Sequence, residues 1–142
     1  MSGPTERTLI ALREAGLAAE VVEKWIPPGK RKDLFGFIDV LALDGERGFI
    51  GIQVTTANCI SERMKKLTGE RKEEVLTWLA TNGGRVELWG WRKLKNVLKN
   101  GKLGKGYTWH PRIWSVVTTG YSFSPGISFI PFDPKRYSEK FR

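Results

Sequence analysis

Two apolar segments in the first half of the chain predict neighbouring central strands of a sheet. Residues 33–44 read DLFGFIDVLALD and residues 49–56 read FIGIQVTT, with the short turn GERG between them. Nearly every position is apolar, which is typical of strands that are buried on both faces. Because side chains alternate along a strand, we expect Asp39 to share one face with its apolar neighbours at positions 35, 37, 41 and 43.

The remaining periodicities predict two further helical regions and several shorter strands. Residues 4–15 have the pattern of a helix that begins near Pro4 and ends near Gly16. A second helical region covers residues 61–81 and is broken near Gly69. Strands are predicted at 19–26, 85–91 and 112–119, a basic loop at 29–32, an irregular basic stretch at 92–107 and a peripheral tail at 131–142.

Polar side chains inside the two apolar strands are the first candidates for chemistry. A buried carboxylate costs several kcal/mol or more unless a cation or a hydrogen-bond donor faces it, so Asp39 requires a partner, either a metal ion or a basic side chain. Gln53 is the only glutamine in the chain and shares a strand face with Thr55. A structural ion pair at Asp39 and a satisfied core amide at Gln53 remain alternatives.

Glu6 is the third candidate, because its helical phase places it near the apolar stripe of residues 4–15. At 100° per residue, Leu9, Ile10 and Leu17 fall near the same side as Glu6. The alternative is a carboxylate that only stabilises the positive end of the helix dipole.

Charge favours a polyanionic partner. The chain has 142 residues and a formal net charge of +9, and nucleic acid is the commonest partner of so basic a protein. No segment approaches the roughly 18 apolar residues that a membrane span requires. The single cysteine, Cys59, excludes an internal disulfide and a cysteine-based zinc cluster. With no basic-then-apolar leader pattern in the first eight residues, we expect a cytoplasmic protein forming one domain.

The order helix, strand, strand, strand, helix, strand, with these residues in place, resembles the PD-(D/E)XK nuclease superfamily, and within it the archaeal-type Holliday-junction resolvases. The early helix ERTLIALREAG, residues 6–16, is similar to the family's first helix, which carries a Glu. FGFIDV places Asp39 at the family's strand aspartate, and QVT places Gln53 and Thr55 at its (D/E)-X-K. The resemblance covers about residues 5–91, which we take as the core of a single nuclease-like domain of residues 1–142, with 92–142 as a basic C-terminal extension.

The resemblance implies an α/β fold with a restriction-endonuclease-like central mixed sheet flanked by helices. It implies a Mg²⁺-dependent endodeoxyribonuclease, with Mn²⁺ as a substitute, in which Asp39, Gln53, the Val54 carbonyl and Glu6 would hold the metal. Two departures matter: Gln53 replaces an acid, and Thr55 replaces the lysine that orients the attacking water. A basic residue from elsewhere would take the lysine's place, with Lys32 the leading candidate and Lys30, Arg31 and Arg63 the others.

Several basic residues are candidates for contacts with DNA phosphates. They lie in the 29–32 loop, at the start of the helical region 61–81 and in the 92–107 stretch. The set is Lys30, Arg31, Lys32, Arg63, Lys93, Lys95 and Lys99. The expected substrate is branched DNA, cut by a homodimer to which the Trp-rich strand 85–91 contributes. Trp91 and Trp109 are candidates for stacking on splayed bases. The alternatives are a non-catalytic nucleic-acid-binding module on the same fold and a restriction-type endonuclease that cuts linear duplex.

Overall fold

The computed structural model describes residues 3–142. Met1 and Ser2, the first two of the eight residues that lack a leader pattern, lie outside the described residues. The described residues form three α-helices and eight strands, with five strands after the first helix and three after the other two. The helices are α1 (Pro4–Glu14), α2 (Ile60–Thr68) and α3 (Lys72–Ala80). The strands are β1 (Ala18–Val21), β2 (Lys24–Ile26), β3 (Lys30–Lys32), β4 (Val40–Asp44), β5 (Gly48–Thr56), β6 (Gly84–Val97), β7 (Leu103–Tyr121) and β8 (Ser124–Phe132). Short 3-10 turns cover Ala57–Cys59 and Pro134–Arg136. No helix of this part of the chain is long and apolar enough to cross a bilayer.

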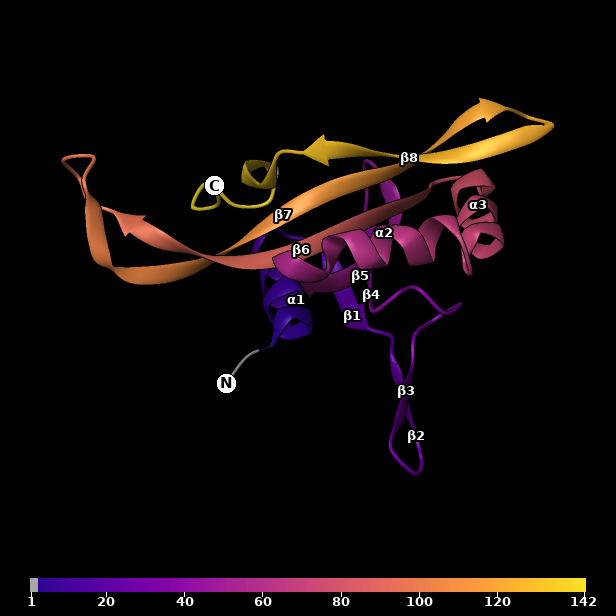
Figure 1. Ribbon diagram of the computed structural model, residues 1–142, viewed down its shortest axis with the longest axis horizontal. Helices are drawn as coiled ribbons and strands as arrows, with labels where there is room; N and C mark the ends of the chain where they lie inside the picture. The colour runs from indigo at the N-terminus through magenta and orange to yellow at the C-terminus, as the bar shows by residue number, and fades with distance from the viewer. Residues whose placement is uncertain (1–2) are drawn as a thin grey trace.

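Six strands form one mixed sheet in the order β1-β4-β5-β6-β7-β8 (Figure 1). Neighbouring strands are antiparallel except β5 and β6, which are parallel. A parallel pair needs a crossover connection, and α2 and α3 supply it. The predicted α/β class, with a central mixed sheet and flanking helices, is therefore confirmed.

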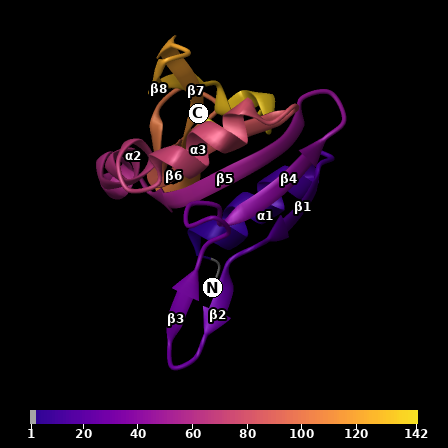
Figure 2. The same ribbon diagram turned by 90° about the vertical axis from the view of Figure 1, so that its right-hand side faces the viewer.

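Helices cover both faces of the sheet and form two apolar cores. On one face Ala11 and Leu12 of α1 pack against the inner residues of β4, β5 and β6, including Ile52 and Trp89. On the other face Ile60, Leu67 and Val75 of α2 and α3 pack against Val86 and Leu88 of β6, with Phe37 and Ile38 beside them. Figure 2 shows α1 and the α2–α3 pair on opposite sides of the sheet. This double cover explains why residues 50–55 of β5 are all buried, as predicted for a central strand.

The first helix ends as its sequence predicts, but the prediction that Glu6 lies near the apolar stripe is wrong. Gly16 has φ +92°, and the Leu17 N–H donates to the Leu12 carbonyl, which closes the last turn. The residues that α1 buries are Thr8, Ala11 and Leu12, so the apolar stripe runs along a phase that excludes Glu6. Glu6 is exposed.

Residues 18–39 differ most from the predicted strands. The segment 19–26 splits into β1 and β2, and the expected basic loop 29–32 is strand β3, which pairs with β2 around Pro27-Pro28-Gly29. This β2–β3 hairpin projects from the sheet (Figure 1). Residues 33–37 form a turn rather than a strand, so Phe35 does not share a face with Asp39. Leu43, also expected on a buried face, is 58% exposed, because it lies on the face of β4 opposite Val40 and Ala42 and belongs to neither core.

Residues 92–107 belong to regular sheet, contrary to the expectation of an irregular basic stretch. Residues 92–107 continue β6 and begin β7, and the pairing of Lys93 with Trp109 and of Lys95 with Tyr107 extends the ladder into a long arm (Figure 1). Both faces of this arm are largely open to solvent, so no core-facing periodicity marks it in the sequence. Residues 85–91 lie in the middle of the sheet and are mostly buried, so they are not a dimer interface.

The tail is anchored, not peripheral. Tyr137 is 7% exposed and belongs to the core on the α1 face, and Phe141 packs edge-on against Trp91. Trp91 is only 3% exposed, and the Arg7 guanidinium covers the Trp109 ring at 3.8 Å from its centroid. The expectation that these two tryptophans stack on bases is therefore wrong.

Candidate active site

Asp39 and Gln53 face each other across two neighbouring strands. Val40 of β4 pairs with Ile52 of β5, which places Asp39 opposite Gln53, and the Asp39 N–H donates to the Ile52 carbonyl at 2.9 Å. Gln53 Nε2 donates to Asp39 Oδ2 at 2.6 Å, and the Val54 N–H donates to the same oxygen at 2.8 Å. Asp39 is 6% exposed and Gln53 is 1% exposed. The predicted pair is thus one hydrogen-bonded unit inside the protein.

Two carboxylates that were not in the predicted metal set complete the site. Glu23 follows β1 and Asp33 follows β3, and one carboxylate oxygen from each lies within 4.8 Å of the other and of Asp39. Glu6 is not part of this cluster, because α1 directs it to solvent. It lines a neighbouring cavity of about 620 Å³ together with Glu23. One signal in the sequence points to Asp33: it is an acid at the border of an apolar segment that contains Asp39.

Burial and neighbouring negative charge keep the Asp39 carboxyl protonated over a wide range of pH. Loss of hydration is the main cause that raises the pKa of Asp39 to about 8. The adjoining Asp33 and Glu23 carboxyls also favour the protonated form, while the Val54 N–H opposes the rise. A cation placed among these three carboxyls would reverse that balance, because it favours the charged form. Ion binding at this cluster should therefore release a proton.

The basic group nearest the cluster is Lys66 of α2, which no sequence pattern singled out. Its Nζ lies 3.2 Å from Asp33 Oδ2, with 19% of the side chain exposed. Lys66 follows Arg63 by three residues, so the two share one side of α2. Among the predicted substitutes, Arg31 pairs with Glu23 at 3.7 Å and Lys32 is exposed on β3.

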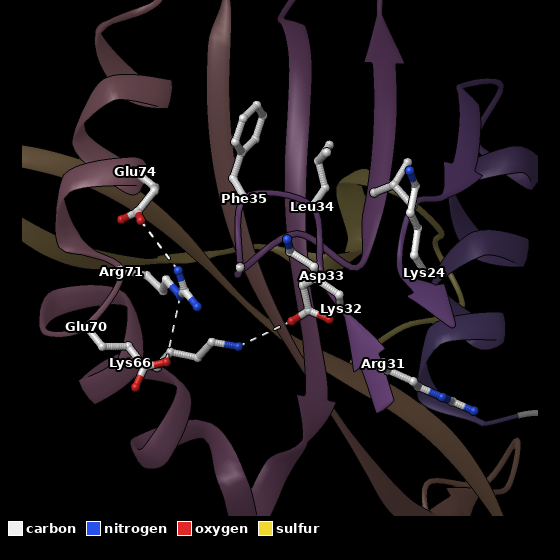
Figure 3. A pocket seen from close by; sticks show the side chains of 12 residues that line it. Lys24, Arg31, Lys32, Asp33, Leu34, Phe35, Lys66, Glu70, Arg71 and Glu74 are labelled. Atoms are coloured by element: carbon white, nitrogen blue, oxygen red, sulfur yellow. Dashed lines mark hydrogen bonds and ion pairs between the residues drawn. The ribbon is translucent and has the colours of Figure 1, made fainter. Parts of the chain in front are cut away.

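A charged cavity of about 610 Å³ opens beside the cluster (Figure 3). Five cationic side chains line it against three acidic ones. The cations are Lys24, Arg31, Lys32, Lys66 and Arg71, and the acids are Asp33, Glu70 and Glu74. Two of the basic residues predicted to replace the motif lysine, Lys30 and Arg63, do not line this cavity. The excess of positive charge is suited to a phosphate group.

The remaining predicted residues lie either on β5 beside Gln53 or on the distant β6–β7 arm. Thr55 is 6% exposed and lies on the same strand face as Gln53. The peptide groups of a strand residue point to one edge, so the Val54 carbonyl faces the Asp39 side together with its N–H. Lys93, Lys95 and Lys99 are exposed on the β6–β7 arm, beyond the helices (Figure 1).

The donor set is all oxygen. Three carboxyls meet at the cluster, and Gln53 Oε1 is buried with no hydrogen-bond partner among the described residues. A buried amide oxygen without a partner costs about 1–3 kcal/mol, and a hard cation is one ligand that would satisfy it. No protein-family model matches the chain, and no curated protein or solved structure matches it significantly.

Proposed function

We propose that this protein is a metal-dependent DNA endonuclease, with branched DNA such as a four-way junction as its leading substrate. The observation that carries the proposal is the buried Asp39–Gln53 pair, set beside Glu23 and Asp33 at the edge of a cationic cavity. Oxygen ligands of this kind suit Mg²⁺ or Mn²⁺, and the cavity suits the phosphate that would be cut.

The topology supports the same proposal. Helix α1, the antiparallel strands β1, β4 and β5, the helices α2 and α3, and the parallel strand β6 follow one another in the order typical of PD-(D/E)XK nucleases. The β2–β3 hairpin is an insertion between the first two of these strands. A two-fold dimer would present two such sites to the two strands of a junction.

Each residue has a role that follows from its position. Asp39, Asp33 and Glu23 would hold the cation, with the Gln53 amide turned so that its oxygen faces the ion. When bound, the cation would neutralise charge on the phosphate and activate water. Lys66, paired with Asp33, would orient the attacking water. It would thereby take the role of the motif lysine, whose position Thr55 occupies in this chain.

The direct test is incubation of the protein with a four-way junction and with linear duplex of matched sequence, in Mg²⁺, Mn²⁺ or EDTA. We expect cleavage that requires the metal and favours the junction. Equal cutting of both substrates would support the restriction-type alternative. Binding without turnover in any metal would support the non-catalytic module, which the replacement of the motif acid and lysine by Gln53 and Thr55 favours.

Lys66→Met should reduce turnover on the order of 100-fold, because removal of a positioned proton-transfer or charge-stabilising group costs rates of this size. Affinity for DNA in EDTA should change little, since one phosphate contact at most is lost. Single-turnover cleavage and a filter-binding isotherm measure the two quantities separately.

The neighbouring Lys65→Met is the matched control, because Lys65 lies on the exposed side of the same helix. Undiminished turnover in Lys66→Met would remove Lys66 from the site. If Lys32→Ala alone abolished cleavage, Lys32 would be the substitute lysine instead.

The β6–β7 arm should make DNA binding steeply dependent on salt. Residues 88–132 contain seven lysines and arginines and no acid. Each phosphate contact contributes about −0.9 to the slope of log K against log salt. Neutralising Lys93, Lys95 and Lys99 together should therefore flatten the slope by as much as about 2.7. The charge-matched control neutralises Lys135, Arg136 and Lys140, three exposed residues of the anchored tail. Equal effects of the two triple variants would mean that only net charge matters.

A further inference from the structure

An aromatic hollow adjoins the cationic cavity. It has a volume of about 470 Å³, and its walls are the rings of Phe35, Phe49 and Trp78. Phe49 and Phe35 each form a T-shaped ring contact with Trp78, with centroid distances of 5.1 Å and 6.1 Å respectively. The Trp78 indole N–H donates to the Arg85 carbonyl at 2.8 Å, so this wall is fixed in place. Glu73, Glu74, Thr77 and Thr81 form the polar rim.

Phe35 has a backbone conformation that packing alone does not explain. Its φ is +53°, the left-handed region that bulky residues avoid, and its side chain remains 58% exposed. A strained residue persists where the surrounding structure holds it, and such residues concentrate at functional sites. The tight turn at residues 34–37 requires this conformation, since Gly36 also has φ +78° and the Phe37 N–H donates to the Leu34 carbonyl at 3.2 Å. The turn leaves the Phe35 ring exposed beside the hollow.

The hollow and the cationic cavity are two parts of one surface. Phe35 and Glu74 line both, and Phe35 lies two residues after Asp33 of the acidic cluster. Figure 3 shows Phe35 and the Asp33 carboxylate extending from opposite sides of the same turn. A ligand with a charged group in the cationic cavity could thus place a flat apolar group against Phe35.

We propose that the hollow binds one unpaired nucleobase of the strand whose phosphate lies in the cationic cavity. The Phe35 ring offers a stacking face. The carboxylates of Glu73 and Glu74 can accept hydrogen bonds from an exocyclic amino group, as acidic side chains do with cytosine. A base inside a duplex cannot enter, so the ligand is single-stranded, frayed at a branch point or flipped out of the stack. The inference rests on the proposed function only for the class of ligand, nucleic acid, and not for cleavage.

The test is binding in EDTA, where no cutting intervenes. The probe is a single-stranded octanucleotide with one 2-aminopurine, compared with a blunt duplex of the same sequence. Phe35→Asn removes the ring but keeps a residue that tolerates positive φ, so the fold should survive. We expect it to weaken single-strand binding on the order of tenfold, to abolish the 2-aminopurine quenching and to leave duplex binding within about twofold.

Two controls separate the ring from the position. Phe35→Tyr keeps a stacking face and should bind as the wild type does. Tyr121→Ala removes an exposed aromatic side chain at the β7–β8 turn and should change nothing. An abasic sugar in place of one base tests the same contact with the unmodified protein and should weaken binding by a similar factor.

Wild-type affinity in Phe35→Asn, or equal losses for single strand and duplex, would overturn the inference. Its failure differs from failure of the nuclease proposal. A protein that cuts no DNA in any metal but discriminates through Phe35 would retain the base site and lose the nuclease function. Metal-dependent cleavage together with unchanged DNA binding by Phe35→Asn would support the nuclease function and rule out the base site.

Discussion

Replacing Asp39 with asparagine should abolish metal-dependent cleavage while the protein stays folded. The asparagine amide oxygen can still accept the Val54 N–H bond, so the strand pairing at the site survives. The carboxylate that would bind the cation is lost, which for a central ligand should reduce the rate by at least about 100-fold. Single-turnover cleavage with Mg²⁺ and Mn²⁺ measures the effect. Glu46→Gln, a change at an exposed turn, is the control. Full activity of Asp39→Asn would contradict the nuclease assignment.

The same substitution should stabilise the metal-free protein, and more so as the pH rises. Burial raises the pKa of Asp39 to about 8, against an ordinary value of 3.8 in the unfolded chain. Between these two values the folded protein holds a proton that the unfolded chain has released, so this group lowers stability as the pH rises. The asparagine side chain lacks that titration. The gain in free energy of unfolding should therefore be small near pH 4 and reach several kcal/mol near pH 8.

Urea unfolding at both pH values, in EDTA, checks this expectation. Added Mn²⁺ should stabilise the wild type and not Asp39→Asn, because only the wild type has the full ligand set. A gain that is equal at both pH values would mean that the carboxyl is already charged in the folded protein.

Glu87→Ala should cost about 3–5 kcal/mol of stability, because it removes one partner of a largely buried ion pair together with the acceptor of two buried hydrogen bonds. Glu87 is 2% exposed, and its carboxylate accepts bonds from Arg47 at 3.1 Å and from Tyr137 and Trp89 at 2.9 Å each. Without it, the Tyr137 hydroxyl and the Trp89 indole N–H lose their buried acceptor, and the partly buried Arg47 keeps only its carboxylate pair with Asp44 at 3.0 Å.

Thermal and urea unfolding measure this loss, with Glu20→Ala as the control. Glu20 has 81% of its side chain exposed and lies 3.8 Å from Arg13, so its removal should cost less than about 1 kcal/mol. Similar losses in both variants would show that the Glu87 network contributes nothing beyond an exposed ion pair.

The buried strands and the helix boundaries were accessible from sequence because each has a local cause. Glycines at positions 16 and 69 end helices, and the apolar run 49–56 is compatible with a strand covered on both faces. The need of Asp39 for a partner was also predictable, because a buried carboxylate must be satisfied. The sequence indicated a metal ion or a basic side chain, whereas the structure supplies the Gln53 amide.

The rest of the site depended on distant chain segments. Glu23 and Asp33 lie in the connections on either side of an inserted hairpin, and only its folding returns them to Asp39. Lys66 reaches them from the crossover helix, across 33 positions of sequence. No local pattern records such proximity, because it is set by strand register and by the packing of α2 on the sheet.

Periodicity and composition were sufficient to predict the first helix, the central strand at 49–56, the helical region and strand that follow it, the basic charge and the two polar residues, since each of these is a local property of the chain. Packing in three dimensions was needed to show which carboxylates join Asp39, which lysine faces them and that Tyr137 closes the core. It was also needed to show that residues 92–107 are strands. That arm has no apolar face, and its regularity comes from main-chain hydrogen bonds to a partner strand, which side-chain patterns do not encode.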